Sequence, residues 1–158
     1  MHTKPIQPSA ILALPQANNN EAIRDVVYYN YIGVVKLLLA DSRVDPSAEN
    51  NEAIREASCY GYTETVRLLL DDSRVDPSAD DNEAIRCASY FGHVEIVKLL
   101  LADSRVDPMA RDNESIRQAR QNKHTKIVRL LLADSRVGPA ARGNESIRLA
   151  SGAKLHGD

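Results

Sequence analysis

The sequence of 158 residues contains no tryptophan, one phenylalanine and only two cysteines. Cys59 and Cys87 are too few for a disulfide framework and too far apart for a zinc knuckle, so we expect two reduced thiols that serve as small apolar side chains. The apolar stretch at residues 11–14 is shorter than the roughly 7–15 residues of a signal-peptide core, and no apolar run approaches a membrane span. We therefore expect an intracellular, cytoplasmic protein that makes no membrane contact.

The chain also lacks a large excess of charge of one sign, because 20 basic and 22 acidic side chains leave a net charge of -2. The whole molecule thus has no overall attraction for DNA or for an anionic membrane. Apolar residues make up 43% of the chain, and leucine, valine, isoleucine and alanine dominate them. A core of this aliphatic composition suits thin, repeated layers of helices better than a barrel or a sandwich.

A repeat of 31 residues is the strongest feature of the sequence. Each complete unit begins with Asn-Glu-Ala/Ser-Ile-Arg, continues to a basic residue followed by three leucines, and ends with Asp-Ser-Arg-Val and a proline two residues later. The first asparagines of units 1 to 5 are Asn20, Asn51, Asn82, Asn113 and Asn144. The first four units are complete and in register, which predicts a solenoid of stacked, identical layers.

Each unit is expected to form a helix, a tight turn, a second helix and an extended linker. Asn82 is a suitable N-cap for the first helix, and Gly92 can end that helix in a left-handed conformation. Lys123 takes the glycine position in unit 4, at a cost of about 1 kcal/mol if the conformation is kept. The second helix of unit 3 is apolar at residues 96, 97 and 99–101, so neighbouring units must cover it on two sides.

Residues 91–101, Phe-Gly-His-Val-Glu-Ile-Val-Lys-Leu-Leu-Leu, resemble the ankyrin repeat, in which a Gly-His turn precedes a Glu-Val-Val-Lys-Leu-Leu-Leu helix. Two features depart from that family: the period is 31 rather than 33 residues, and arginine replaces the histidine of the Thr-Pro-Leu-His segment. We therefore expect arginines and nearby carboxylates to connect the units. The resemblance implies an all-α helix-turn-helix solenoid that binds protein partners. It also implies a protein that acts inside a eukaryotic cell, which is the host cell if the protein is viral.

The predicted boundaries are a tail at residues 1–9, the repeat array at 10–152 and a second tail at 153–158. Unit 5 stops after its first helix, and a partial unit precedes unit 1, so both ends lack the polar caps of most solenoids. The ends are either frayed or join copies head to tail into a fibre, which is the alternative to a partner-binding function. The candidate self-association residues are Ile11, Leu12, Leu14, Ile147 and Leu149.

All seven aromatic residues fall at the end of a first helix or in the turn after it. The ankyrin resemblance places this region on the concave surface that meets partners, where tyrosine offers large contact area at low entropic cost. Tyr31 and Tyr62 occupy the turn-histidine position, so we interpret them as packing between units. The candidate partner-binding residues are Tyr28, Tyr29, Tyr60, Tyr90 and Phe91, with Met109 as an extension near the linker.

The second half of the chain is more basic than the first, because residues 80–158 hold 11 acidic and 13 basic side chains whereas residues 1–79 hold 11 and 7, and unit 4 is the most basic part. Arg120, Lys123 and Lys126 are specific to this unit, and we add them to the candidate partner-binding set. They form either a solvated basic face or a contact for an acidic protein, a nucleic acid or the acidic front of another copy. No aromatic residue is interleaved with them, which makes nucleic acid the weaker alternative.

No pattern of catalytic residues emerges from the four histidines, the two cysteines or the repeated Asp-Ser-Arg-Val segments. The aspartates recur where every unit needs a turn, so turn formation and ion pairing explain them. No phosphate-binding glycine loop or metal-ligand spacing is present. The sequence therefore predicts a non-catalytic protein-binding adaptor or scaffold with no cofactor.

Overall fold

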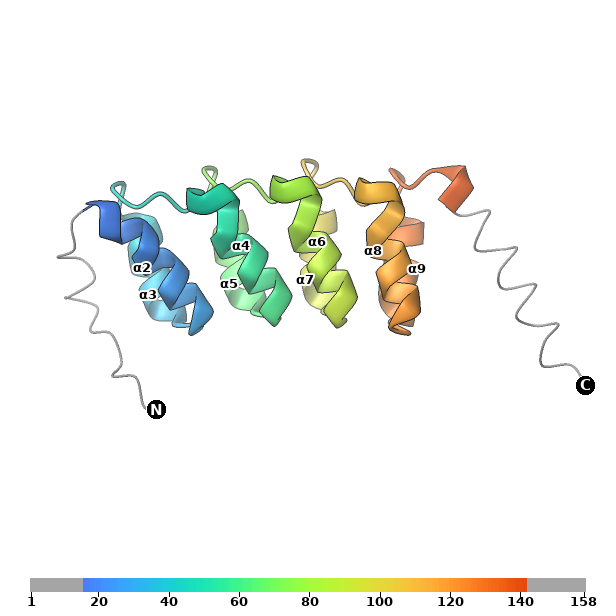
Figure 1. The fold of residues 1–158 in the computed structure, drawn as a ribbon, viewed down its shortest axis with the longest axis horizontal. Coiled ribbons are helices and arrows are strands. Elements are labelled where there is room, and N and C mark those ends of the chain that lie inside the picture. Colours follow the sequence, from blue (N-terminus) through green and yellow to red (C-terminus); the bar gives the residue numbers. More distant parts are fainter. Residues whose placement is uncertain (1–15, 142–158) are drawn as a thin grey trace, which may run out of the picture.

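The structure, a computed structural model, describes residues 16–141, and all the secondary structure in that range is helical. The helices follow one another in pairs, each pair joined by a tight turn and followed by an extended linker (Figure 1). They are α2 (Gln16–Tyr28), α3 (Ile32–Ala40), α4 (Ala48–Tyr60), α5 (Thr63–Leu70), α6 (Ala79–Phe91), α7 (Val94–Leu101), α8 (Ala110–Gln121) and α9 (Thr125–Ala133).

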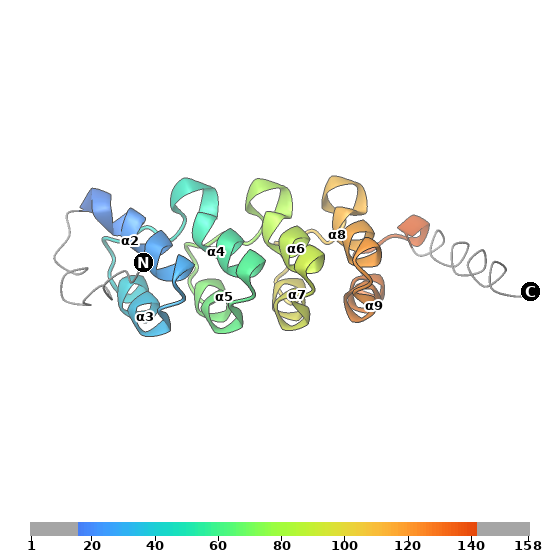
Figure 2. The ribbon, with the colours of Figure 1, turned by 60° about the horizontal axis from the view of Figure 1, so that its bottom comes forward.

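The helix pairs stack side by side in sequence order and form an elongated solenoid of two layers. The first helices of the units, α2, α4, α6 and α8, form one layer, and the second helices, α3, α5, α7 and α9, form the other (Figures 1 and 2). The all-α solenoid predicted from the 31-residue period is therefore confirmed. None of the helices within residues 16–141 combines the length and the apolar character needed to cross a membrane.

The core repeats in the same way as the sequence, with one buried isoleucine from each first helix and one buried leucine from each second helix. Each of these side chains has at most 1% of its surface exposed, and burial of such a side chain contributes roughly 1.5–3 kcal/mol. They are Ile23, Ile54, Ile85 and Ile116 from the first helices, and Leu38, Leu69, Leu100 and Leu131 from the second helices. The apolar layers are thus sandwiched between neighbours, as the broad apolar surface of the second helices predicts.

Arginines on the first helices pair with glutamates of the following unit. Arg24 Nε lies 2.9 Å from Glu52 Oε2, Arg86 Nη1 lies 3.1 Å from Glu114 Oε2, and Arg55 pairs with Glu83 in the same manner. This series confirms the expectation that arginines and carboxylates connect the units. Partly exposed ion pairs contribute at most about 1 kcal/mol each, so they align the units more than they stabilise them.

A second series of arginines lies in the Asp-Ser-Arg-Val segments that follow the second helices. Arg105 Nη1 donates a hydrogen bond to the Val75 carbonyl of the preceding unit at 2.8 Å, and its Nε donates to Asp103 at 3.0 Å. This hydrogen bond holds the pKa of the Asp103 carboxyl below its usual value. In units 2 to 4 each aspartate therefore orients an arginine that bonds backward to the previous layer.

The predicted N-cap role of Asn82 is wrong. Asn82 has a left-handed backbone, with φ of 61°, and its Oδ1 accepts a hydrogen bond from the Asp107 N–H of the next unit at 2.7 Å. Asn51 accepts the equivalent bond from the Asp76 N–H at 2.7 Å. Asparagine tolerates the left-handed region better than most residues, so this side chain is used to connect units rather than to cap its own helix.

The left-handed positions after the first helices are those expected from the sequence. Gly61 and Gly92 have φ of 80° and 84°, and Lys123 has φ of 61° at the equivalent position of unit 4. A side chain with a Cβ is strained in this region by roughly 1–2 kcal/mol. Lys123 is exposed, so no packing interaction offsets this cost.

Replacing Lys123 with glycine is expected to raise the free energy of unfolding by about 1 kcal/mol, because glycine removes the Cβ penalty at this position. Urea denaturation followed by circular dichroism measures the change. Lys126→Gly is the control, since Lys126 lies inside α9 and glycine there is expected to destabilise by about 1 kcal/mol. A loss of stability in Lys123→Gly would show that the left-handed turn is not strained in unit 4.

Candidate functional site

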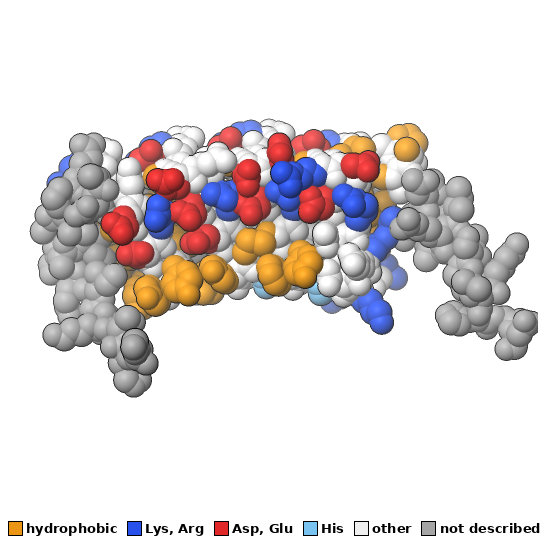
Figure 3. Space-filling model, viewed as in Figure 1, with side chains coloured by type: hydrophobic (Ala, Val, Ile, Leu, Met, Phe, Trp, Pro, Cys, Tyr) orange, Lys and Arg blue, Asp and Glu red, His pale blue; other side chains and the backbone are white. Residues whose placement is uncertain are grey.

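Exposed aromatic side chains lie along the C-terminal ends of α2, α4 and α6. Between 44% and 54% of the surface of each is accessible to solvent, although large apolar side chains are usually buried. Figure 3 shows apolar side chains along this edge of the molecule, below a row of charged ones. We call this set the aromatic face; it consists of Tyr28, Tyr29, Tyr60, Tyr90 and Phe91.

Ring-to-ring contacts hold the aromatic face in place. The Tyr28 ring meets the rings of Tyr29 and Tyr60 edge to face, with centroids 5.1 and 5.7 Å away. In unit 3 the Tyr90 and Phe91 rings are also in edge contact, with centroids 4.8 Å apart. Such pairs contribute about 0.5–1.5 kcal/mol beyond burial, so the face is an ordered surface before any partner arrives.

The turn residues that precede the second helices connect adjacent units from the same edge. Tyr62 Oη donates a hydrogen bond to the Tyr28 carbonyl at 3.3 Å, and His93 Nε2 bonds to the Cys59 carbonyl at 2.9 Å. His124 Nε2 makes the equivalent bond to the Tyr90 carbonyl at 3.0 Å. Tyr31 is half-buried against the core. These contacts agree with the interpretation of Tyr31 and Tyr62 as packing residues.

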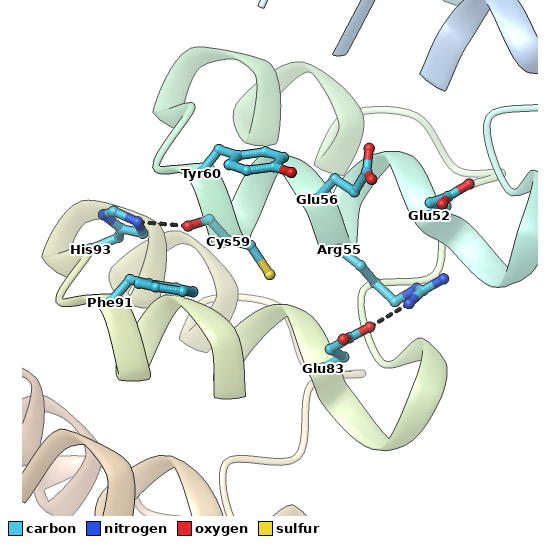
Figure 4. A pocket seen from close by; sticks show the side chains of 8 residues that line it. All are labelled: Glu52, Arg55, Glu56, Cys59, Tyr60, Glu83, Phe91 and His93. Atoms are coloured by element: carbon cyan, nitrogen blue, oxygen red, sulfur yellow. Dashed lines mark hydrogen bonds and ion pairs between the residues drawn. The ribbon is translucent and has the colours of Figure 1, made fainter. Parts of the chain in front are cut away.

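An open groove between α4 and α6 adjoins the aromatic face, and no pattern in the sequence predicts it. Its volume is about 670 Å³, and Tyr60 and Phe91 lie on either side of Cys59 at one end, while charged side chains occupy the other end (Figure 4). The lining residues are Glu52, Arg55, Glu56, Cys59, Tyr60, Glu83, Phe91 and His93. The groove repeats on a smaller scale between α6 and α8, with a volume of about 270 Å³.

Cys59 and Cys87 form a disulfide between α4 and α6, with Cα atoms 5.0 Å apart. The expectation of two reduced thiols is therefore wrong for this structure. The cysteines are 28 residues apart and occupy different positions of the repeat, and only the stacking of units 2 and 3 brings them together. Disulfides persist in oxidising surroundings and are reduced in a typical cytosol, so the bond depends on the compartment.

Glu56 stands out among the carboxylates of the groove because it has no ion pair within residues 16–141. Glu52 pairs with Arg24, and Glu83 pairs with Arg55. Burial raises the pKa of the Glu56 carboxyl and the nearby Glu52 carboxylate adds to that shift, whereas the charges of Arg24 and Arg55 oppose it. Acidic side chains predominate around α2 and α4, whereas basic ones appear toward α8 (Figure 3).

The remaining candidate partner-binding residues lie in or near unit 4 and differ in exposure. Lys123 and Lys126 are exposed, whereas Arg120 is half-buried on α8. Met109 does not join the aromatic face: it lies in the linker before α8 against the core, and its Sδ accepts a hydrogen bond from the Gly138 N–H at 3.2 Å. The candidate self-association residues lie outside residues 16–141, so end-to-end assembly stays a prediction.

Comparisons with known proteins agree with this architecture. A family model described as ankyrin repeats in three copies matches residues 22–112. A search of curated proteins gave no match. One similar solved chain belongs to the crystal structure of the yeast ribosomal protein Rps3 in complex with its chaperone Yar1; the TM-score is 0.63 and the identity 23%, over 80% of this chain and 98% of that one. At this identity the similarity concerns the fold alone.

Proposed function

This chain belongs to the ankyrin-repeat family, and we propose that it is a non-catalytic adaptor that binds a protein partner through its aromatic face. The observation that carries the proposal is the exposure of five large aromatic side chains along one edge of the first-helix layer. Exposed apolar surface of this kind marks interaction sites in soluble proteins. A partner that covers these rings would remove from water the surface that the free protein leaves exposed.

The fixed positions of the rings in the aromatic face favour binding of a specific partner over non-specific hydrophobic association. Edge contacts between neighbouring rings fix these side chains before a partner binds. The side chains therefore lose little conformational freedom on binding. Lys123 and Lys126 extend the proposed surface with positive charge at the unit 4 end. In the similar solved structure an ankyrin-type fold occurs in a complex between a ribosomal protein and its chaperone, which supports a protein as the partner.

The triple variant Tyr28→Ala, Tyr60→Ala and Tyr90→Ala is expected to bind the partner at least about tenfold more weakly than the unchanged protein, because it removes three exposed aromatic contacts. Partners are first captured from extracts of the cells that make the protein, and the affinity of each is then measured with purified components by titration calorimetry. Circular dichroism and thermal melts verify that the variant is folded.

The matched control replaces three exposed cations of the second helices, Lys36, Arg67 and Lys98, with alanine. These side chains occupy one repeat position on α3, α5 and α7, away from the aromatic face. Their replacement is expected to change the affinity by less than about twofold. Equal affinity of the unchanged protein and the tyrosine variant would refute the aromatic face as the binding site.

A further inference from the structure

We propose that the groove between α4 and α6 receives an arginine or lysine side chain from a basic segment of the partner, held between Glu56 and the Tyr60 ring. This inference rests on the proposed function and specifies the chemistry of the partner at one point of the surface. Three features of the groove support it: a lining with three carboxylates and one arginine, in which Glu56 forms no ion pair; two aromatic walls; and the contrast with the neighbouring groove.

The carboxylate of Glu56 forms no ion pair in the described part of the chain, although Arg24 and Arg55 are near enough to attract it. The other carboxylates of the groove, Glu52 and Glu83, already pair with arginines. Glu56 is half-buried, and a carboxylate that is partly removed from water gains most from an opposite charge. Its raised pKa has the same origin in burial and in the charge of Glu52. A cation that enters the groove would therefore be attracted, whereas an anion would be repelled.

The aromatic walls suit the rest of such a side chain. Tyr60 and Phe91 face the hollow from its two sides (Figure 4), and roughly half of the surface of each is exposed. An aliphatic stem packs against ring faces while its charged head stays at the polar end, and a cation near a ring face gains about 0.5–2 kcal/mol. The disulfide between Cys59 and Cys87 fixes the spacing of α4 and α6 beneath these walls.

The neighbouring groove between α6 and α8 provides an internal comparison. Cys87 occupies the repeat position of Glu56 there, and the two carboxylates of that groove, Glu83 and Glu114, pair with Arg55 and Arg86. Aromatic side chains, Tyr90 and Phe91, line this groove as well. Both of these rings lie on α6, and α8 contributes no aromatic side chain to the lining. The neighbouring groove therefore lacks the second aromatic wall as well as a carboxylate at the Glu56 position, so the proposal applies to the groove between α4 and α6 alone.

The test uses a fluorescein-labelled peptide, Arg-Gly-Arg-Gly-Arg-Gly, and the full chain in its disulfide-bonded form. Fluorescence anisotropy measures the dissociation constant, and amide chemical shifts from NMR locate the bound peptide. Glu56→Gln is expected to weaken binding at least about fivefold, and Tyr60→Leu about threefold, because each removes one of the two contacts with the cation. The largest shifts are expected at residues of α4 and α6 that line the groove.

Glu64→Gln is the matched control, since it removes the same charge from an exposed position of α5 in the same unit. It is expected to change the dissociation constant by less than about twofold. Equal weakening by Glu56→Gln and Glu64→Gln, or shifts outside the groove, would overturn the proposal, because the peptide would then sense only the general charge. So would the absence of binding by the unchanged protein. None of these outcomes bears on the tyrosine variant, whose partner binding tests the proposed function separately.

Discussion

Replacing Ile85 with alanine is expected to lower the free energy of unfolding by about 3 kcal/mol. The side chain has no exposed surface and lies on α6, between the helices of units 2 and 4. Loss of its methyl and methylene groups removes buried apolar contact and leaves a cavity, for which Ile→Ala changes cost about 2–5 kcal/mol. A central layer has neighbours on both sides, so the cavity also weakens the coupling between the two halves of the solenoid.

Urea denaturation monitored by circular dichroism measures this loss, and the shape of the transition adds a second readout. Weakened coupling is expected to broaden the transition or to split it in two, as for other repeat arrays in which neighbouring layers no longer unfold together. Arg67→Ala, at an exposed position of α5, is the control and is expected to stay within about 0.5 kcal/mol of the unchanged protein. A loss below about 1 kcal/mol for Ile85→Ala would contradict the stacked-layer core.

Replacing Gly92 with alanine is expected to cost about 2–3 kcal/mol, from two separate causes. The φ of Gly92 is 84°, a conformation that penalises a Cβ by roughly 1–2 kcal/mol. The added Cβ would also lie 2.6 Å from Cε1 of His124, so this ring must move. His124 bonds to the Tyr90 carbonyl, and its displacement therefore disturbs the contact between units 3 and 4.

Gly33→Ala is a matched control for this change. An added Cβ at Gly33, inside α3, would meet no atom within 4 Å. Alanine favours a helix over glycine by up to about 1 kcal/mol, so this variant is expected to be equally stable or more stable. In thermal and urea denaturation the midpoint of Gly92→Ala should therefore fall, whereas that of Gly33→Ala should stay the same or rise. A Gly92→Ala variant as stable as the unchanged protein would show that neither the left-handed turn nor the His124 contact constrains the array.

The sequence predicts the architecture because its information is local and is repeated. The 31-residue period, the glycines after the first helices and the triple leucines define one unit, and identical units can bury their apolar surfaces only by stacking. The arginine positions also predict the connections between layers, as Arg86 and Glu114 confirm. The location of the aromatic face follows from the same period, since its members recur at two adjacent positions of the unit.

By itself the sequence therefore determined the type of layer and the order in which layers follow one another. Only the tertiary structure decided which side chains of successive units meet. It joined Cys59 to Cys87, directed Asn82 to the next linker, and left Glu56 without an ion pair among the described residues. The physical reason is that these contacts depend on the offset and rotation between stacked helices, which arise from packing a whole layer and are not encoded in the spacing of any short segment.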